Sequence, residues 1–303
     1  MKKILPITLF AFTALLVIVS PVDSRAELKT ISKASEGLVW GGCGITKKAF
    51  MTELAKAYEA KTGVHIKLQG GGATKGIRGV NNGTINIGGA CRASMEFNKE
   101  ERYVKQVPVA WDAIVFVVHK NNPVDNITIK QVREIYDGKL TNWSQLGGTD
   151  APIELYVRAS KISGVGQTLR ELVFHDTEKE FTSNARIVKS SGPAEKAVEN
   201  TVMAMTATGV SSAKRRNVKI LKVEGHEPSY DKIKQGKYML YRPIYLVTKL
   251  NVKNPLVKDF IKYATSEEGM IVIRKAGTVP YKDALHLLSK HFRQYEKAIA
   301  SGL

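Results

Sequence analysis

Three short glycine-bearing segments contain the residues of this sequence that are best suited to chemistry. They are Gly41-Gly42-Cys43-Gly44-Ile45-Thr46, Gly70-Gly71-Gly72-Ala73-Thr74 and Ser163-Gly164-Val165-Gly166-Gln167-Thr168. Each follows a strand-like run or a loop and precedes a helix-like run. Glycine lets the backbone approach a ligand closely, and the free N–H groups and dipole of a helix's first turn favour an anion. Three such turns that met in one cleft would form a cage for a small oxyanion.

The elements around these segments are predicted to alternate between strands and helices. Leu38–Trp40, Val64–Leu68 and Ile85–Ile87 are predicted strands, and a glycine-bearing turn follows each of them. Thr46 is predicted to cap the first helix. This order favours an α/β fold with parallel strands, whose ligands bind at the carboxyl ends of the strands.

Two long apolar runs, Val107–His119 and Tyr238–Thr248, are predicted to be strands that two lobes share. The sequence has no internal repeat and no flexible linker, so we expect two joined lobes rather than independent domains. We assign residues 27–112 and 245–303 to lobe I and residues 113–244 to lobe II. The hinge strands are expected near residues 111–117 and 239–246.

The N-terminus has the three parts of a secretory signal peptide. Met1-Lys2-Lys3 is basic, the run from Ile4 to about Ser20 is apolar, and Ser24-Arg25-Ala26 offers a cleavage site. We therefore expect residues 1–26 to be removed and the protein to be exported. An uncleaved membrane anchor is less favoured, because about 17 apolar residues that include a proline are short for a span.

The chain is strongly basic, with a formal net charge of +18 over 303 residues. Loss of the signal peptide would remove a net charge of +2 and leave +16. Such a charge attracts anions and anionic surfaces. The basic residues are scattered and no nucleic-acid motif is present, so we interpret them as solvated faces and expect no nucleic-acid partner.

Further motifs extend along nearly the whole mature chain. They are Leu68-Gln69-Gly70-Gly71-Gly72, Asn82-Gly83-Thr84-Ile85-Asn86-Ile87-Gly88, Gly138-Lys139-Leu140-Thr141-Asn142-Trp143 with Leu146-Gly147-Gly148, Ser163-Gly164 with Gln167-Thr168, and Gly236-Lys237-Tyr238 with Arg242-Pro243. Together they resemble the substrate-binding protein of phosphate ABC transporters, which has the type II periplasmic-binding fold. The most specific match is the segment from Lys139 to Gly148.

The resemblance implies a monomer of two lobes, each a mixed sheet flanked by helices, that close over one dehydrated oxyanion. It implies a periplasmic location, delivery to an ABC permease in the inner membrane, no cofactor and no covalent chemistry. In this family, hydroxyls and N–H groups of three turns hold the anion together with an arginine and an aspartate. The arginine offers a fork of donors, whereas the aspartate accepts the proton of monohydrogen phosphate and would repel sulfate.

Carried over to this sequence, the resemblance assigns ligand binding to residues of the three turns and to two neighbouring positions. They are Gly44, Ile45, Thr46, Gly72, Ala73, Thr74, Cys91, Arg92, Arg158, Ser163, Gly164 and Val165. Arg158 corresponds to the family's arginine. Four expected polar groups are replaced, by Ile45, Ala73, Val165 and, at the aspartate position, Cys91. Phosphate is therefore the family default, and a related oxyanion remains open.

The resemblance also places Cys43 and Cys91, the two cysteines of the chain, at the cleft. We expect a disulfide between them, because an exported protein meets an oxidising compartment. In the chain-entropy model, closing a loop of about 49 residues contributes on the order of 4 kcal/mol. Two alternatives stay open: a thiol-based metal or metalloid site, for example for arsenite in a sensory module, and unpaired buried thiols.

Neither a catalytic site nor a resident metal site is indicated. The six histidines lack the i, i+4 spacing of a zinc pair, and Ser163-Gly164 lacks the G-x-S-x-G elbow. We therefore do not expect an enzyme, and a secreted enzyme acting on phosphate esters is the least favoured of the three hypotheses.

Overall fold

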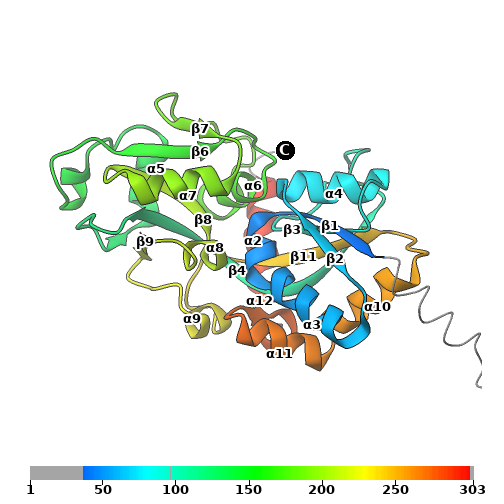
Figure 1. The fold of residues 1–303 in the computed structure, drawn as a ribbon. Coiled ribbons are helices and arrows are strands. Elements are labelled where there is room, and N and C mark those ends of the chain that lie inside the picture. Colours follow the sequence, from blue (N-terminus) through cyan, green and yellow to red (C-terminus); the bar gives the residue numbers. More distant parts are fainter. Residues whose placement is uncertain (1–36, 96, 301–303) are drawn as a thin grey trace, which may run out of the picture.

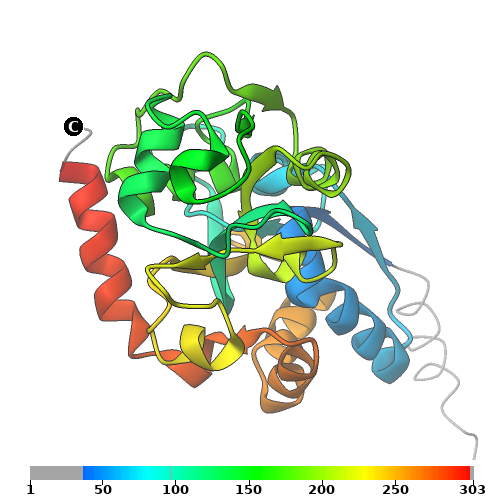
Figure 2. The ribbon, with the colours of Figure 1, turned by 90° about the vertical axis from the view of Figure 1, so that its left-hand side faces the viewer.

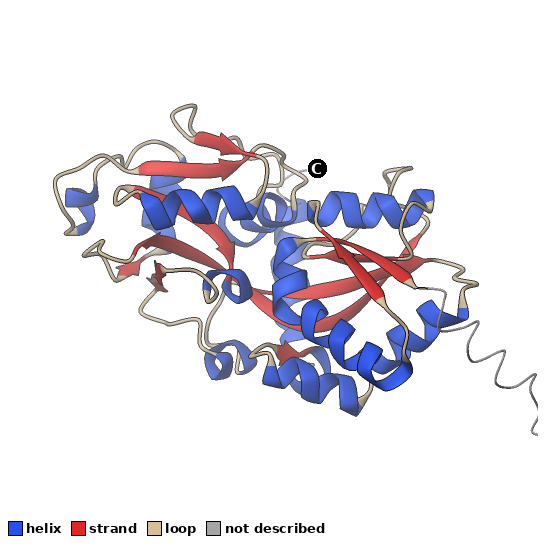
Figure 3. Ribbon diagram, viewed as in Figure 1, coloured by secondary structure: helices blue, strands red, loops and turns tan. Residues whose placement is uncertain are grey.

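The computed structural model describes residues 37–95 and 97–300. The signal peptide expected at residues 1–26 lies outside these described residues. The chain forms an α/β structure whose main sheet has the strand order β2-β1-β3-β11-β4-β8-β6-β7, with β12 and β9 also paired to β4. Figures 1 and 3 show the two ends of this sheet as separate groups of strands, each flanked by helices. The predicted α/β class with mixed sheets is confirmed.

The first half of the sheet combines strands from both ends of the chain. It contains β1 (Leu38–Gly42), β2 (Ile66–Gln69), β3 (Ile87–Ala90), β11 (Tyr241–Lys249) and β12 (Val279–Pro280). β1 pairs in parallel with β2 and β3, and β11 runs antiparallel to β3. The helices of this half are α2 (Gly44–Thr46), η1 (Lys47–Met51), α3 (Thr52–Thr62), α4 (Gly72–Asn82), α10 (Pro255–Ala264) and α11 (Glu267–Lys275).

The second half of the sheet comes from the middle of the chain. Its strands are β6 (Glu154–Arg158), β7 (Arg186–Val188), β8 (Ala204–Gly209) and β9 (Val218–Ile220). β6 pairs in parallel with β7 and β8. Its helices are α5 (Ile129–Tyr136), η2 (Trp143–Leu146), α6 (Gly164–Leu169), η3 (Arg170–Phe174), α7 (Ser191–Asn200), α8 (Val210–Ala213) and α9 (Tyr230–Lys234), and β5 (Asn126–Ile127) and β10 (Lys222–Val223) form a small separate sheet.

One long strand, β4 (Val104–His119), joins the two halves. Its residues 104–113 pair with β11, and its residues 114–118 pair with β8. Residues 109–118 are buried, as the long apolar run in the sequence predicts. Figure 1 shows β4 passing between the two groups of strands.

The last helix, α12 (Leu287–Ala300), lies along one flank and contacts elements of both halves. It follows η4 (Tyr281–Ala284), where the Tyr281 ring stacks on Trp111 of β4 with centroids 5.1 Å apart. Further along, α12 packs against η3 of the second half. Figure 2 shows this helix, in red, running from the orange helices toward the green ones.

Glycines let β1, β3 and α4 approach backbone to backbone. A Cβ atom added at Gly42 would lie 2.4 Å from the carbonyl oxygen of Gly89, and one at Gly76 would lie 2.8 Å from the same oxygen. Backbone atoms cannot move aside as a flexible side chain does. These glycines therefore fix the spacing of the strand ends from which the first turn emerges.

We predict that Gly42→Ala lowers the free energy of unfolding by about 1–3 kcal/mol, because the added methyl group forces β1 and β3 apart. Urea unfolding followed by circular dichroism measures the change. Gly44→Ala is the matched control: a Cβ there meets nothing within 4 Å, so its effect should stay within about 0.5 kcal/mol. Equal stability of both variants would contradict the proposed role of the close approach.

Candidate functional site

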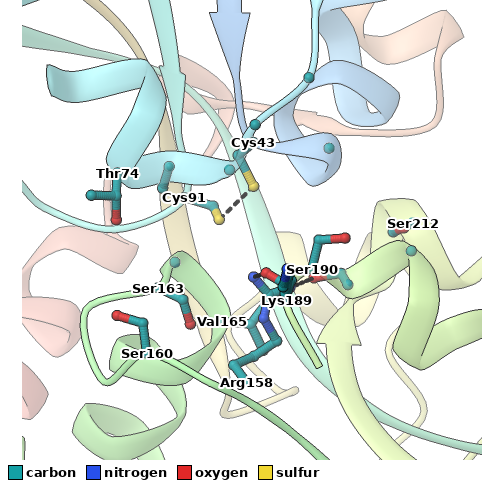
Figure 4. A pocket seen from close by; sticks show the side chains of 18 of the residues that line it. Cys43, Thr74, Cys91, Arg158, Ser160, Ser163, Val165, Lys189, Ser190 and Ser212 are labelled. Atoms are coloured by element: carbon teal, nitrogen blue, oxygen red, sulfur yellow. Dashed lines mark hydrogen bonds between the residues drawn. The ribbon is translucent and has the colours of Figure 1, made fainter. Parts of the chain in front are cut away.

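A cleft of about 570 Å³ lies between the two halves of the sheet. Its lining follows the carboxyl ends of the parallel strands: Cys43 after β1, Gly70–Gly72 after β2, Cys91 after β3, and Arg158 at the end of β6. This is the edge at which α/β sheets bind ligands. Figure 4 shows the two cysteines and Thr74 on one side, facing Arg158, Ser160 and Ser163 on the other.

The helices that begin at the cleft are those that follow the three glycine segments. α2 begins at Gly44, α4 at Gly72 and α6 at Gly164. The Ser163 hydroxyl accepts a hydrogen bond from the Gly166 N–H at 3.1 Å and so caps α6. The first turns of these helices present N–H groups that have no partner within the helix.

Most of the residues expected from the sequence line this cleft. They are Gly44, Gly72, Ala73, Thr74, Cys91, Arg158, Ser163, Gly164 and Val165, together with Cys43. The structure therefore brings the three glycine segments together.

Ile45 and Thr46 lie elsewhere, in the core behind the first turn. The helix begins with Cys43, not Thr46, as its N-terminal cap, so Ile45 and Thr46 already belong to the helix. Both side chains are buried, and the Thr46 hydroxyl has no hydrogen-bond partner. The expectation that Thr46 caps this helix is wrong, because the helix starts two residues earlier.

Arg92 is also absent from the cleft lining. Its guanidinium forms two hydrogen bonds to Glu101, at 2.7 and 2.8 Å, and donates to the carbonyl oxygen of Ile162 at 2.7 Å. Burial alone would raise the pKa of Glu101, but the hydrogen bond and charge of Arg92 bring it below its usual value. The Arg92 charge is thus compensated inside the protein, and a buried pair of this kind leaves little attraction for a ligand.

Hydrogen bonds link the two halves on both sides of the cleft. On one side, Thr74 and Arg92 both donate to the Ile162 carbonyl oxygen. On the other, the Lys48 ammonium lies 3.3 Å from Glu195 and donates to the Ser212 hydroxyl at 2.9 Å. The cleft therefore lies between two sets of polar contacts that connect the two halves.

Several residues that the sequence did not reveal also line the cleft. They are Lys48, Ala159, Ser160, Lys189, Ser190, Ser191, Gly192, Ser212 and Arg216, with Gly70 and Gly71 from the second glycine segment. Ser191 and Gly192 open helix α7, so this helix also begins beside the cleft. Ala159 and Ser160 directly follow Arg158 at the end of β6. Lys48 of one half and Lys189, Ser212 and Arg216 of the other line the same cleft because the two halves dock against each other.

Four Lys and Arg side chains line the cleft, Lys48, Arg158, Lys189 and Arg216, and no Asp or Glu of the described residues is among the lining. Arg158 donates to the Ser191 hydroxyl at 3.1 Å and to the Lys189 carbonyl oxygen at 2.8 Å. Its buried Nε atom has no hydrogen-bond partner among the residues that the structure describes. Desolvation by burial lowers the pKa of Arg158, which is expected of a cation held without a carboxylate beside it. The cleft is therefore built for a negative guest.

The buried carboxylate of Glu195 holds two of the four cleft cations, Lys48 and Arg216, in place. It accepts hydrogen bonds from Thr208 at 2.6 Å and Ser212 at 2.5 Å, and it pairs with Lys48 and Arg216. Burial alone would raise its pKa, but these hydrogen bonds and charges together lower it. Glu195 thus remains ionised and fixes two of the four cations.

The disulfide expected from the sequence stays a prediction, because in this structure Cys43 and Cys91 are free thiols whose sulfur atoms lie 2.7 Å apart in the cleft wall. The hydrogen bond from Cys91 lowers the pKa of Cys43 to about 6, and the same contact raises the pKa of Cys91. The nearby guanidinium of Arg242 also favours the charged form of Cys43. The pair therefore holds one negative charge and one proton near neutral pH.

Arg242 of β11 lies behind the cysteines and is fully buried. One of its terminal nitrogens donates to the carbonyl oxygens of both Cys91 and Gly164, each at 3.0 Å. The other lies 3.5 Å from the carboxylate of Asp112, which accepts hydrogen bonds from Ser211. Arg242 thus joins the turn after β3 to the start of α6.

Within residues 37–95 and 97–300, no group of three or more His, Cys, Asp or Glu side chains is placed to hold a metal ion. No helix in the same range combines the length and apolar character that a membrane crossing requires.

Comparison with known proteins gives consistent matches over most of the chain. The profile of the PBP superfamily domain matches residues 32–268. The phosphate-binding protein PstS of Borreliella burgdorferi is 26% identical over 82% of this chain and 91% of its own length. A crystal structure from Clostridium perfringens, of a putative phosphate ABC transporter substrate-binding protein with bound phosphate, is 31% identical, covers 81% of this chain and 99% of that one, and has a TM-score of 0.73. An ABC-type phosphate transport receptor from Vibrio cholerae is 25% identical over 81% of this chain and all of its own, with a TM-score of 0.62.

We predict that Glu195→Gln lowers the free energy of unfolding by about 2–4 kcal/mol at neutral pH, because buried donors lose their charged acceptor. The pKa of Glu195 is lowered by folding, so its contribution is present above the unfolded pKa and is lost as the pH falls through the folded value. The gap between wild type and variant should therefore shrink below about pH 4.5. Urea unfolding across this range measures it.

Glu199→Gln is the matched control for this prediction. Glu199 lies on the same helix and also pairs with Arg216, but its side chain is 20% exposed. We expect a cost of about 1 kcal/mol or less. A Glu195→Gln effect that did not change with pH would show that lost packing, not lost charge, is responsible.

Proposed function

The chain belongs to the PBP superfamily and, within it, to the substrate-binding proteins of phosphate ABC transporters, and from this premise we propose that it captures phosphate in the interlobe cleft. As a member of this family it is a binding protein and not an enzyme, in agreement with the sequence prediction. The single observation that carries the proposal is the set of four cations lining the cleft beside three helix starts.

The proposed binding mode uses main-chain donors from both sides of the cleft. N–H groups of the first turns that begin at Gly44, Gly72 and Gly164 surround the anion, and the Ser163 hydroxyl adds a donor. Arg158, which lines the cleft, supplies the charged donor. Because these donors are held in place by secondary structure, little ordering cost is left for binding.

We further propose that residues 27–112 with 245–303, and residues 113–244, are the two lobes that close on the ligand. Support comes from β4 and β11, which run from one half of the sheet toward the other near residues 111–117 and 239–246. Hinge closure would expel water and strengthen the electrostatic attraction inside the cleft. Helix α12, which belongs to lobe I by sequence, also packs against η3 of the other half.

The partner in this proposal is an ABC permease, to which the closed, loaded form of the monomer delivers its ligand. The relatives described above carry names that specify phosphate binding or phosphate transport. Because Ala73, Val165 and Cys91 stand in the cleft where the family has polar groups, the proposed ligand class also includes oxyanions related to phosphate. Titration calorimetry with phosphate, sulfate, arsenate and arsenite tests the assignment. Binding of phosphate and arsenate is expected, whereas tight binding of arsenite alone would favour the thiol-based metalloid site instead.

The proposed location is the periplasm, reached by export and removal of residues 1–26. We predict that mature protein recovered from the exported fraction begins at Glu27, because cleavage follows the small-x-small sequence that ends at Ala26. N-terminal sequencing or intact mass measures this directly. If the mature chain still begins at Met1 and stays with the membrane, the prediction is wrong and the N-terminal segment is an uncleaved membrane anchor.

We predict that Arg158→Ala weakens phosphate binding by about 2–4 kcal/mol, because a buried anion would lose its charged, fork-shaped donor. Titration calorimetry measures the change, and Arg158→Lys should recover only part of it, since an ammonium lacks the fork. Arg186→Ala is the matched control: Arg186 lies on the adjacent strand β7, pairs with Glu154 and is absent from the cleft lining. Equal affinities for Arg158→Ala and Arg186→Ala would remove Arg158 from the site.

A further inference from the structure

The two cysteines combine three properties that the oxyanion-binding function does not require. Their sulfur atoms lie 2.7 Å apart, both residues line the cleft, and both are buried. A disulfide bond is about 2.05 Å long, so the sulfur atoms need to approach by only about 0.6 Å to form one. The two residues come from neighbouring parallel strands, β1 and β3, which hold them in this position.

We propose that Cys43 and Cys91 are a reversible dithiol–disulfide pair, and that its oxidation removes an acceptor for the ligand's proton and thereby reduces the discrimination between phosphate and sulfate. This inference rests on the function proposed above and concerns the regulation of the same site. It assigns a modification site and a specificity-determining role to two residues of this chain.

The chemistry of the reduced pair supports this role. The pKa of Cys43 is lowered to about 6, first by the hydrogen bond from Cys91, so its sulfur is largely a thiolate above that pH. A thiolate accepts hydrogen bonds and cannot donate one. Monohydrogen phosphate can offer its proton to such an acceptor, whereas sulfate has no proton and is repelled by the charge.

The charged groups around the pair come from three other strands. Arg242 of β11 favours the charged form of Cys43, and Asp112 of β4 disfavours the charged form of Cys91. Arg158 of β6 faces both cysteines across the cleft and is affected by their charge. A disulfide has no ionisable group, so oxidation removes one negative charge from among these residues and leaves the cations in place.

The oxidation step balances with a disulfide as the oxidant, such as oxidised glutathione. The Cys43 thiolate attacks one sulfur of glutathione disulfide, forms a mixed disulfide and releases one glutathione thiolate. Cys91 then gives up its proton and attacks the Cys43 sulfur, which forms the Cys43–Cys91 bond and releases the second glutathione. Two electrons and one proton pass in total from the cysteine pair to glutathione, and the second glutathione thiolate takes its proton from solvent, giving two molecules of reduced glutathione.

Access to the pair depends on separation of the two halves. Gly164 of the opposite half covers Cys91 so closely that a Cβ at this position would lie 2.3 Å from its sulfur. We therefore expect the ligand-free protein to react with glutathione disulfide faster than the phosphate-loaded protein.

The test compares the two redox forms of the unmutated protein. Ligand-free protein is incubated with oxidised or reduced glutathione, and intact mass confirms the loss of two hydrogen atoms on oxidation. Titration calorimetry then gives the dissociation constants for phosphate and sulfate in each form. At about pH 8 we expect the sulfate-to-phosphate ratio of dissociation constants to fall at least about tenfold on oxidation, and at about pH 5 the change should nearly disappear because Cys43 is protonated.

The matched control is the double variant Cys43→Ser, Cys91→Ser, which cannot form a disulfide and whose ratio should not respond to glutathione. If a variant fails to fold by circular dichroism, the comparison of the two wild-type forms still decides the question. Thiols that stay free in glutathione disulfide, or a disulfide that leaves the ratio unchanged, would overturn the inference. Absence of phosphate binding in both forms would instead overturn the proposed function, and the specificity role with it.

Discussion

The arrangement of the cleft depends on one buried cation, the guanidinium of Arg242. It donates to the carbonyl oxygens of Cys91 and Gly164, which belong to turns from opposite halves of the sheet. Its position on β11, beside β4, places this contact exactly where the two halves join. A buried charge is costly unless it is paired, so the contacts of the two terminal nitrogens hold the two turns and Asp112 to the arginine as much as they hold the arginine in place.

The buried cations and the cations of the cleft therefore have different roles. Arg92 and Arg242 are neutralised by carboxylates and serve the architecture, whereas Arg158 and Lys189 face the cleft without a carboxylate partner. Lys48 and Arg216 stand between these classes, because both line the cleft and both pair with Glu195. The net charge of the chain thus says little about the site by itself. The attraction of the cleft for an anion depends on the cations that are not paired with a carboxylate of the protein.

The sequence was sufficient for the features that depend on local signals. Glycine turns after apolar runs marked the strand ends, and helix starts at Gly72 and Gly164 followed from them. Tertiary features could not be predicted in this way. The pairing of Arg92 with Glu101 arises in an irregular segment, Lys48 and Arg216 meet only when the halves dock, and the short, exposed strand β7 has no strand pattern. The π-helical turns η1 and η3 likewise have no signature in the sequence.

The cross-links on the two sides of the cleft differ in their contact with water, and this difference bears on how a guest escapes. Arg92 is completely shielded where it holds Ile162, whereas the Lys48 side chain is 29% exposed where it reaches Glu195. Water can replace the partners of an exposed ammonium at small cost, but not those of a shielded guanidinium. The two halves should therefore separate first on the side of Lys48, and the ligand would leave the cleft from that side. The residence time of the ligand would then depend on ionic strength.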